Sequence, residues 1–143
     1  MRTVKQLLDG KGRSVIAVAP EEPVLEAIQL MADHHIGAVL VMRGDELAGI
    51  LSERDYARKV ILRGRSSAET QAWEIMSSPV TTVSPEDSVH HCMRLMTEHR
   101  FRHLPVREDG RISGVLSIGD LVKAVIEDQQ EEISQLQQYI TAG

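Results

Sequence analysis

One phrase of seven residues, Gly49-Ile50-Leu51-Ser52-Glu53-Arg54-Asp55, returns 65 positions later as Gly114-Val115-Leu116-Ser117-Ile118-Gly119-Asp120. Both copies read glycine, two aliphatic residues, serine, two variable residues and aspartate, a pattern called here the Gly-h-h-Ser-x-x-Asp motif. Around it, residues 18–61 align with residues 83–126 without a gap, and 14 of the 44 aligned pairs are identical. Average residue usage gives roughly three identities by chance. The chain is therefore built from two copies of one unit.

Each copy shows the same order of secondary-structure patterns. A short β-prone run (15–18 and 80–83) precedes a helical apolar pattern, and two apolar runs around a polar turn (38–51 and 103–116) indicate a hairpin. A second helix is expected after the motif serine. The order β-α-β-β-α, twice, predicts an α/β (α+β) fold with a three-stranded sheet in each repeat. Because a lone repeat leaves an apolar face exposed, the two repeats are expected to pack around a pseudo-twofold axis.

Changes in composition along the chain set the expected boundaries. We expect a first repeat with a lead-in helix at 1–64, a linker at 65–72, a second repeat at 73–126 and a C-terminal helical tail at 127–143. The tail carries four acids and no base, and isoleucines recur every seven residues at Ile126, Ile133 and Ile140. This spacing fits a weak dimerisation seam. It fits a terminal helix packed on its own body equally well.

Composition narrows the class of protein. The 143 residues are 42% apolar and 26% charged, with a net charge of −5, as in an ordinary globular chain. Outside the acidic tail the charges nearly balance and only 3% of residues are aromatic, so nucleic-acid binding is not expected. No apolar run reaches the length of a membrane span, and the N-terminus lacks the layout of a signal peptide. A single cysteine, Cys92, excludes an internal disulfide and fits a cytoplasmic protein.

The motif has two interpretations. In the first it is a capping box, in which serine caps a helix and the aspartate three residues later bonds back to it. In the second it is a ligand site, because free N–H groups at a helix start, with the serine hydroxyl, attract a phosphate. A carboxylate beside that phosphate would then accept hydrogen bonds from the paired hydroxyls of a ribose. Together these groups describe a nucleotide, and recurrence of the whole motif in both repeats favours the ligand site.

The doubled β-α-β-β-α unit, its motif and the stretch Arg102-His103-Leu104-Pro105-Val106 resemble a tandem pair of cystathionine-β-synthase (CBS) domains over roughly residues 4–126. The chain is similar to the stand-alone bacterial CBS-pair proteins. The resemblance implies a Bateman module: a non-catalytic protein of signal transduction or energy sensing that binds AMP, ADP, ATP, NAD or a similar adenosyl ligand between its repeats. It also implies a homodimer. The alternative is a structural or interaction subunit whose motifs are only helix caps.

The resemblance further assigns the residues of the nucleotide site. It implies that Asp55 and Asp120 hold ribose hydroxyls and that Ser52 and Ser117 lie near ribose or phosphate. The other positions implied lie ahead of the first helix, around the start of the hairpin and inside the motif. They are Ile16, Ala17, Thr81, Thr82, Ile36, Gly37, Ala38, Phe101, Arg102, His103, Pro105, Glu53, Arg54, Ile118 and Gly119.

Metal binding and catalysis are not expected. The pairs His34-His35 and His90-His91 have no further ligand at zinc spacing, so no metal is required. A Gly-x-Ser-x-Gly hydrolase motif is absent from the sequence. Arg54 stands inside the motif and is expected at the ligand. Arg58 and Lys59 fit either a solvated helix face or a source of positive charge for a phosphate.

Overall fold

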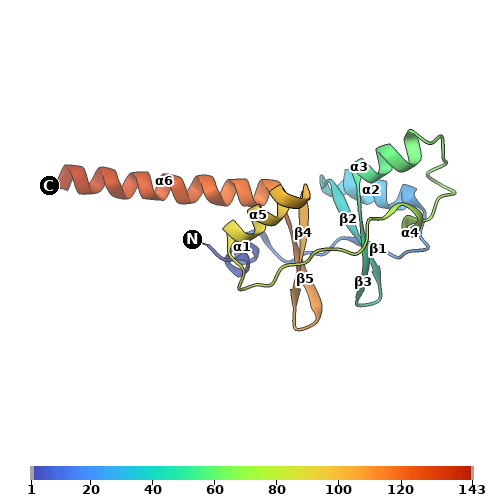
Figure 1. Cartoon of the computed structure of the whole chain (residues 1–143), viewed down its shortest axis with the longest axis horizontal. Helices are drawn as coiled ribbons and strands as arrows, with labels where there is room; N and C mark the ends of the chain where they lie inside the picture. The colour runs from blue at the N-terminus through green and yellow to red at the C-terminus, as the bar shows by residue number, and fades with distance from the viewer. Residues whose placement is uncertain (1, 143) are drawn as a thin grey trace. The chain divides into compact units, whose positions relative to one another are not determined.

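A computed structural model describes residues 2–142. The chain divides into two compact units, which we describe separately. Unit 1 comprises Met1–Arg13, Thr82–Glu108 and Ser113–Gly143, and unit 2 comprises Ser14–Thr81 and Asp109–Ile112. Each unit thus carries one repeat, and the mixed α/β fold expected from the repeats is confirmed (Figure 1).

Unit 2 is a three-stranded sheet covered by helices. The strands lie in the order β1 (Ala17–Val18), β2 (Ala38–Arg43) and β3 (Glu46–Ser52), with β1 parallel to β2 and β2 antiparallel to β3. The helices are α2 (Val24–His34), α3 (Glu53–Tyr56), the π-helix η1 (Ala57–Ile61) that continues α3, and α4 (Ala72–Ile75). Their apolar faces meet the sheet in one aliphatic core that includes Val24, Val41 and Leu51.

Unit 1 repeats this plan with a smaller sheet. Its elements are α1 (Val4–Lys11), α5 (Val89–His99), the hairpin of β4 (His103–Glu108) and β5 (Arg111–Ser117), and α6 (Ile118–Ala142). The strand expected at 80–83 is reduced to a single bridge between Val83 and Val106. In unit 2 the N–H of Leu40 donates to the carbonyl of Ile16 at 3.1 Å, but the equivalent position in unit 1 is Pro105, which has no N–H to donate. The expectation of three strands was therefore wrong for the second repeat.

The two lead-in helices are exchanged between the repeats. Helix α1 precedes the first repeat in sequence, yet Val4 lies in the core of the second, and its N–H donates to the carbonyl of Asp87 at 2.8 Å. Helix α4 precedes the second repeat, yet Ala72 lies in the core of the first and its N–H donates to the carbonyl of Glu22 at 2.8 Å. The range 1–64 expected for the first repeat and its lead-in helix therefore spans both units.

The motif glycines allow the exchanged segments to approach the sheets. A Cβ atom on Gly49 would lie 2.5 Å from Sδ of Met76 and 3.0 Å from the carbonyl oxygen of Ser77, just after α4. A Cβ atom on Gly114 would lie 2.8 Å from Cδ2 of Leu8 in α1. Real Cβ atoms essentially never come within 3.0 Å of another heavy atom, so alanine at either position would force the crossing segment or its side chain to shift.

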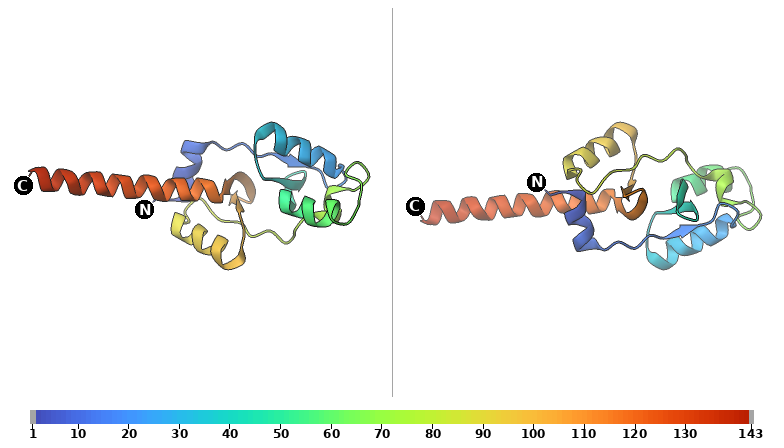
Figure 2. Two further views of the ribbon diagram at one scale, coloured as in Figure 1. Left: turned by 90° about the horizontal axis from the view of Figure 1, so that it is seen from above. Right: turned by 90° about the horizontal axis from the view of Figure 1, so that it is seen from below.

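Helix α6 begins inside the core and ends outside it. Leu121 and Ala124 are buried, whereas every side chain described beyond Asp128 is exposed. In both views of Figure 2 the last turns run clear of the other elements of unit 1. The expected helical tail is confirmed, and its first residues, Glu127 and Asp128, form ion pairs with Arg2 of the same unit. Within residues 2–142, no helix combines the length and the apolar character needed to cross a membrane.

Candidate functional site

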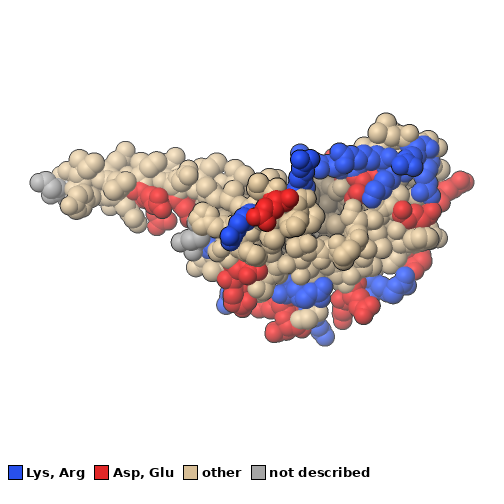
Figure 3. Space-filling model, viewed as in Figure 1, with Lys and Arg blue, Asp and Glu red and all other residues tan. Residues whose placement is uncertain are grey.

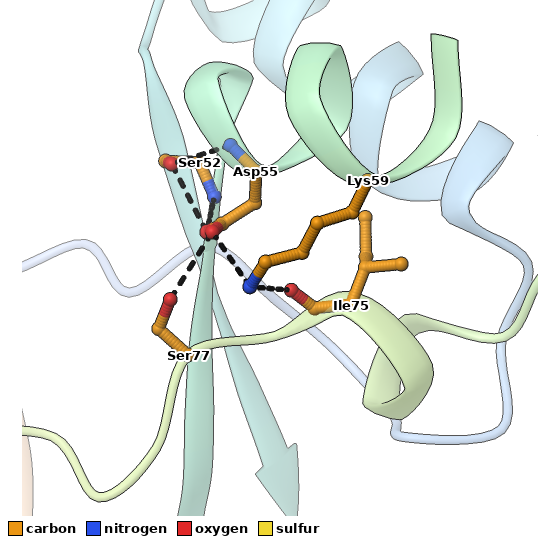
Figure 4. A network of polar contacts seen from close by, with 5 residues as sticks. All are labelled: Ser52, Asp55, Lys59, Ile75 and Ser77. Atoms are coloured by element: carbon orange, nitrogen blue, oxygen red, sulfur yellow. Dashed lines mark hydrogen bonds and ion pairs between the residues drawn. The ribbon is translucent and has the colours of Figure 1, made fainter. Parts of the chain in front are cut away.

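The first motif lies where β3 ends and α3 begins. The N–H of Asp55 donates to Oγ of Ser52 at 3.1 Å, and Oδ2 of Asp55 accepts from both the N–H and the hydroxyl of Ser52 at 3.0 Å each (Figure 4). These reciprocal bonds form a capping box. The capping interpretation is therefore satisfied by the geometry, and it occupies one of the two carboxylate oxygens of Asp55.

The other oxygen of Asp55 is occupied by two groups from elsewhere in unit 2. Its Oδ1 accepts from the hydroxyl of Ser77 at 3.1 Å and pairs with Nζ of Lys59 at 3.1 Å (Figure 4). The Lys59 ammonium also donates to the carbonyl of Ile75 at 2.9 Å. The Asp55 side chain is only 13% exposed. Lys59 therefore lies over the motif carboxylate rather than on a solvated helix face.

The second motif has the same reciprocal pair at the start of α6. The N–H of Ser117 donates to Oδ2 of Asp120 at 2.7 Å, and the N–H of Asp120 donates to Oγ of Ser117 at 3.2 Å. The same Oδ2 pairs with the ammonium of Lys11, which also donates to the carbonyl of Val115 at 2.6 Å. Lys11 ends α1, so an exchanged segment supplies the cation of this motif. Its counterpart in the other repeat is Met76, which carries no charge.

The surroundings of the second motif lower the pKa values of two side chains, Asp120 and His103. Burial of Asp120 favours its neutral form, but hydrogen bonds from Lys11 and Ser117 outweigh burial and lower the pKa of Asp120 below its ordinary 3.8. The pKa of His103 is lowered below 6.5, first by burial and then by the Lys11 charge, against which the Asp120 charge acts. The corner therefore holds a carboxylate, an ammonium and a neutral imidazole at pH 7.

The start of the first hairpin strand lies beside each motif, as expected. In unit 2 the N–H of Glu53 donates to the carbonyl of Gly37 at 3.0 Å, and Ala38 pairs with Ser52 across β2 and β3. In unit 1 the equivalent bond joins the N–H of Ile118 to the carbonyl of Arg102 at 2.9 Å. This corner of the sheet is built in the same way twice.

The other expected site residues lie on nearby elements, with two kinds of exception. Ile16 lies just before β1, Ala17 is its first residue, and His103 begins β4. Exposed positions of the motif helices are Glu53, Arg54, Ile118 and Gly119. Ile36, Phe101 and Pro105 instead belong largely to the cores, and Thr81 and Thr82 lie outside any strand, in unit 2 and unit 1 respectively.

Positive charge gathers on one side of unit 2. Arg54, Arg58 and Arg63 are exposed along and just after α3 and η1, and Lys and Arg side chains crowd this segment in Figure 3. Unit 1 has a single cation, Lys123, on the matching turns of α6. An anionic group would therefore meet different surroundings at the two motifs.

Two residues of the motif networks, Ser77 and Lys11, were not expected from the sequence, because they lie 22 and 109 residues from their aspartates. For Lys59 the sequence left two roles open, a solvated helix face or positive charge for a phosphate. Its position four residues after Asp55 is a helical spacing that favours the observed ion pair. Among residues 2–142 no group of three or more His, Cys, Asp or Glu side chains is placed to hold a metal ion.

The two units therefore contain the same kind of sheet corner, with a serine, an aspartate and an ammonium at the start of a helix. The family model for the CBS domain matches residues 10–62 and 72–127, so the chain belongs to the CBS domain family. "CBS domain-containing protein CBSX3, mitochondrial" from Arabidopsis thaliana is 39% identical over 150 aligned positions, covering 99% of this chain and 73% of the relative. The crystal structure of "CBS domain, NE2398" is 49% identical, with a TM-score of 0.84, covering 87% of this chain and 98% of that one.

More distant structures share the fold and hold ligands. The CBS domain pair of protein MJ0100, in complex with 5′-methylthioadenosine and S-adenosyl-L-methionine, is 22% identical with a TM-score of 0.79, covering 90% of this chain and 98% of that one. Hypoxic Response Protein I, with two coordinated zinc ions, is 26% identical with a TM-score of 0.74, covering 85% and 98%. These ligands belong to those proteins.

Proposed function

We propose that this protein is a non-catalytic regulatory module that binds an adenosyl ligand, such as AMP, ADP, ATP or NAD, at its Ser-x-x-Asp motifs. The observation that carries the proposal is the repetition of one polar corner. In both units a serine hydroxyl, an aspartate and the start of the first hairpin strand meet at the beginning of a helix. A capping role alone explains the serine and the aspartate but not the ammonium brought to each carboxylate.

The chemistry of the corner fits a nucleotide. A carboxylate that accepts hydrogen bonds suits the vicinal hydroxyls of ribose, while N–H groups, hydroxyls and cations suit a phosphate. The adenosyl ligands of the MJ0100 domain pair have the ribose that this arrangement would recognise. The ligand would shift the balance between two arrangements of the chain only if it binds one of them more tightly than the other. A partner protein or a second copy of the chain would then bind the two arrangements differently.

A thermal and calorimetric experiment tests the proposal. At AMP concentrations of about 100 times the dissociation constant, one site adds about 2.7 kcal/mol to the free energy of unfolding. For a chain of this length that raises the Tm by about 5–10 °C. Inorganic phosphate at the same concentration and 2′,3′-dideoxyadenosine monophosphate should raise it much less. Absence of a Tm response to all of AMP, ADP, ATP and NAD would instead favour a structural subunit, and turnover of ATP detected by chromatography would reveal an enzyme.

A control carboxylate separates the motif from nonspecific charge. Asp33 near the end of α2 is exposed and accepts from Gln29 within its own helix, at 3.0 Å. Asp33→Asn should leave AMP affinity unchanged within about twofold, since this carboxylate pairs with Gln29 and not with a residue of either motif. A motif variant that binds AMP no more weakly than Asp33→Asn has no role in the site.

We also propose that the protein is a homodimer to which the exposed end of α6 contributes. Ile133, Leu136 and Ile140 are 48%, 62% and 74% exposed and follow one another at intervals of three and four residues. This interval places them on one helix face, as in a coiled-coil seam. A second copy of α6 would remove that face from water.

A further inference from the structure

We propose that the two motifs are not equivalent. The ribose-binding carboxylate is Asp120, whereas the carboxylate of Asp55 is already occupied by Lys59 and Ser77. This inference rests on the proposed function and adds the order in which the sites fill. It comes from counting the hydrogen-bond acceptors that each carboxylate has left. An ionised carboxylate offers about four lone-pair sites, two on each oxygen.

The acceptor capacity of Asp55 is fully used. Oδ2 takes the N–H and the hydroxyl of Ser52, and Oδ1 takes the hydroxyl of Ser77 and the ammonium of Lys59. A ribose diol reaching Asp55 would have to displace at least one of these four donors. Displacement of the Ser77 hydroxyl requires that side chain to rotate, since two backbone bonds with Ile50 at 2.8 and 3.0 Å hold the backbone of Ser77 in place.

The acceptor capacity of Asp120 is less fully used. Its contacts with the N–H of Ser117 and the ammonium of Lys11 both fall on Oδ2. The hydroxyl of Ser117 also donates toward this carboxylate, and within residues 2–142 no separate donor is placed on Oδ1 of Asp120. The side chain is also more exposed, at 25% against 13% for Asp55. One carboxylate oxygen of Asp120 is therefore available to a ligand without displacing Lys11 or the N–H of Ser117.

The difference follows from which residues the two lead-in segments bring. The residue equivalent to Ser77 in the other lead-in segment is Gly12, which has no hydroxyl to donate to Asp120. The residue equivalent to Lys59 in the second repeat is Ala124 of α6, which is buried and uncharged. The second motif thus lacks both groups that close the first, and the ammonium of Lys11 binds the oxygen that Ser117 already occupies.

Calorimetric titration with AMP tests the order of filling. We expect wild type to bind one AMP per chain in its tight phase. Asp120→Asn should weaken this phase by about 10- to 150-fold, because a hydrogen bond to a charged acceptor is weakened. Asp55→Asn should change it less than about threefold. Lys59→Ala combined with Ser77→Ala, which removes both closing groups and copies Ala124, should raise the stoichiometry toward two.

Several outcomes overturn the proposal. One is the finding of two equal AMP sites in wild type. Another is a larger loss of AMP affinity in Asp55→Asn than in Asp120→Asn. The third is that the Lys59→Ala and Ser77→Ala double variant still binds one AMP per chain. Wild type that binds no adenosyl ligand at all refutes the proposed function instead. A measurement without substitutions guards against variants that fail to fold: on AMP addition the 13C carboxyl resonance of Asp120 should move and that of Asp55 should not, and the reverse pattern refutes the assignment.

Discussion

Replacing Gly49 by alanine tests whether the crossing segment fixes the first motif. The added Cβ would lie 2.5 Å from Sδ of Met76, which can turn away, and 3.0 Å from the carbonyl oxygen of Ser77, which cannot. That carbonyl accepts from the N–H of Ile50 at 3.0 Å, and the N–H of Ser77 donates back to Ile50 at 2.8 Å. The segment can retreat only by straining both bonds.

The expected cost follows from these contacts. Overpacking of this kind costs about 1–3 kcal/mol, and the smaller conformational freedom of alanine in the unfolded chain offsets about 0.4–1 kcal/mol of it. The net loss is about 1–2 kcal/mol. With an unfolding entropy of about 2.1 cal/mol/K per residue, a chain of 143 residues should lose about 3–7 °C in Tm.

Two other glycines provide matched controls. At Gly114 the added Cβ would meet side-chain atoms of Leu8, the nearest at 2.8 Å, so Gly114→Ala should cost less than Gly49→Ala. Gly10 lies inside α1 with nothing within 4 Å of its added Cβ, so Gly10→Ala should raise the Tm by about 2–3 °C through helix propensity. Differential scanning calorimetry should therefore order the variants Gly10, Gly114, Gly49 from most to least stable. If Gly49→Ala melts at or above the wild-type temperature, the reasoning about the crossing segment is wrong.

Three further predictions concern charge and assembly. The pKa of His103 is below 6.5 in the folded chain, so the unfolded chain takes up the proton first as the pH falls. The contribution of His103 to the free energy of unfolding is therefore complete above pH 6.5 and decreases below it. Below pH 6.5 the stability of His103→Gln should depend less on pH than that of wild type, and an identical slope would contradict the lowered pKa. Lys11→Met, which copies Met76, should raise the pKa of Asp120 toward 3.8 in an NMR titration and cost about 0.5–1 kcal/mol at pH 7; an unchanged pKa would show that the ammonium is not the cause. Sedimentation should give wild type about twice 15.9 kDa and Ile133→Glu a lower mass, whereas a wild-type mass of 15.9 kDa would refute the dimer.

Local patterns in the sequence were sufficient for most of the fold. The duplication, the two hairpins and the helices after Ser52 and Ser117 repeat at short range, where the periods of helix and strand leave a direct mark. The capping pairs are local for the same reason, since serine and aspartate stand three residues apart. Even the missing strand of unit 1 had a signal, because Pro105 stands where the other repeat donates an N–H.

The sequence by itself therefore determined the family, the repeat and the position of both motifs, whereas the tertiary structure decided how the two motifs differ. The exchange of α1 and α4 had no local signal, because a short amphipathic helix fits either of two similar aliphatic cores. That exchange brings Lys11 to Asp120 across 109 residues and Ser77 to Asp55 across 22. Whether a carboxylate keeps a free acceptor depends on such distant donors, and no spacing along the chain reveals them.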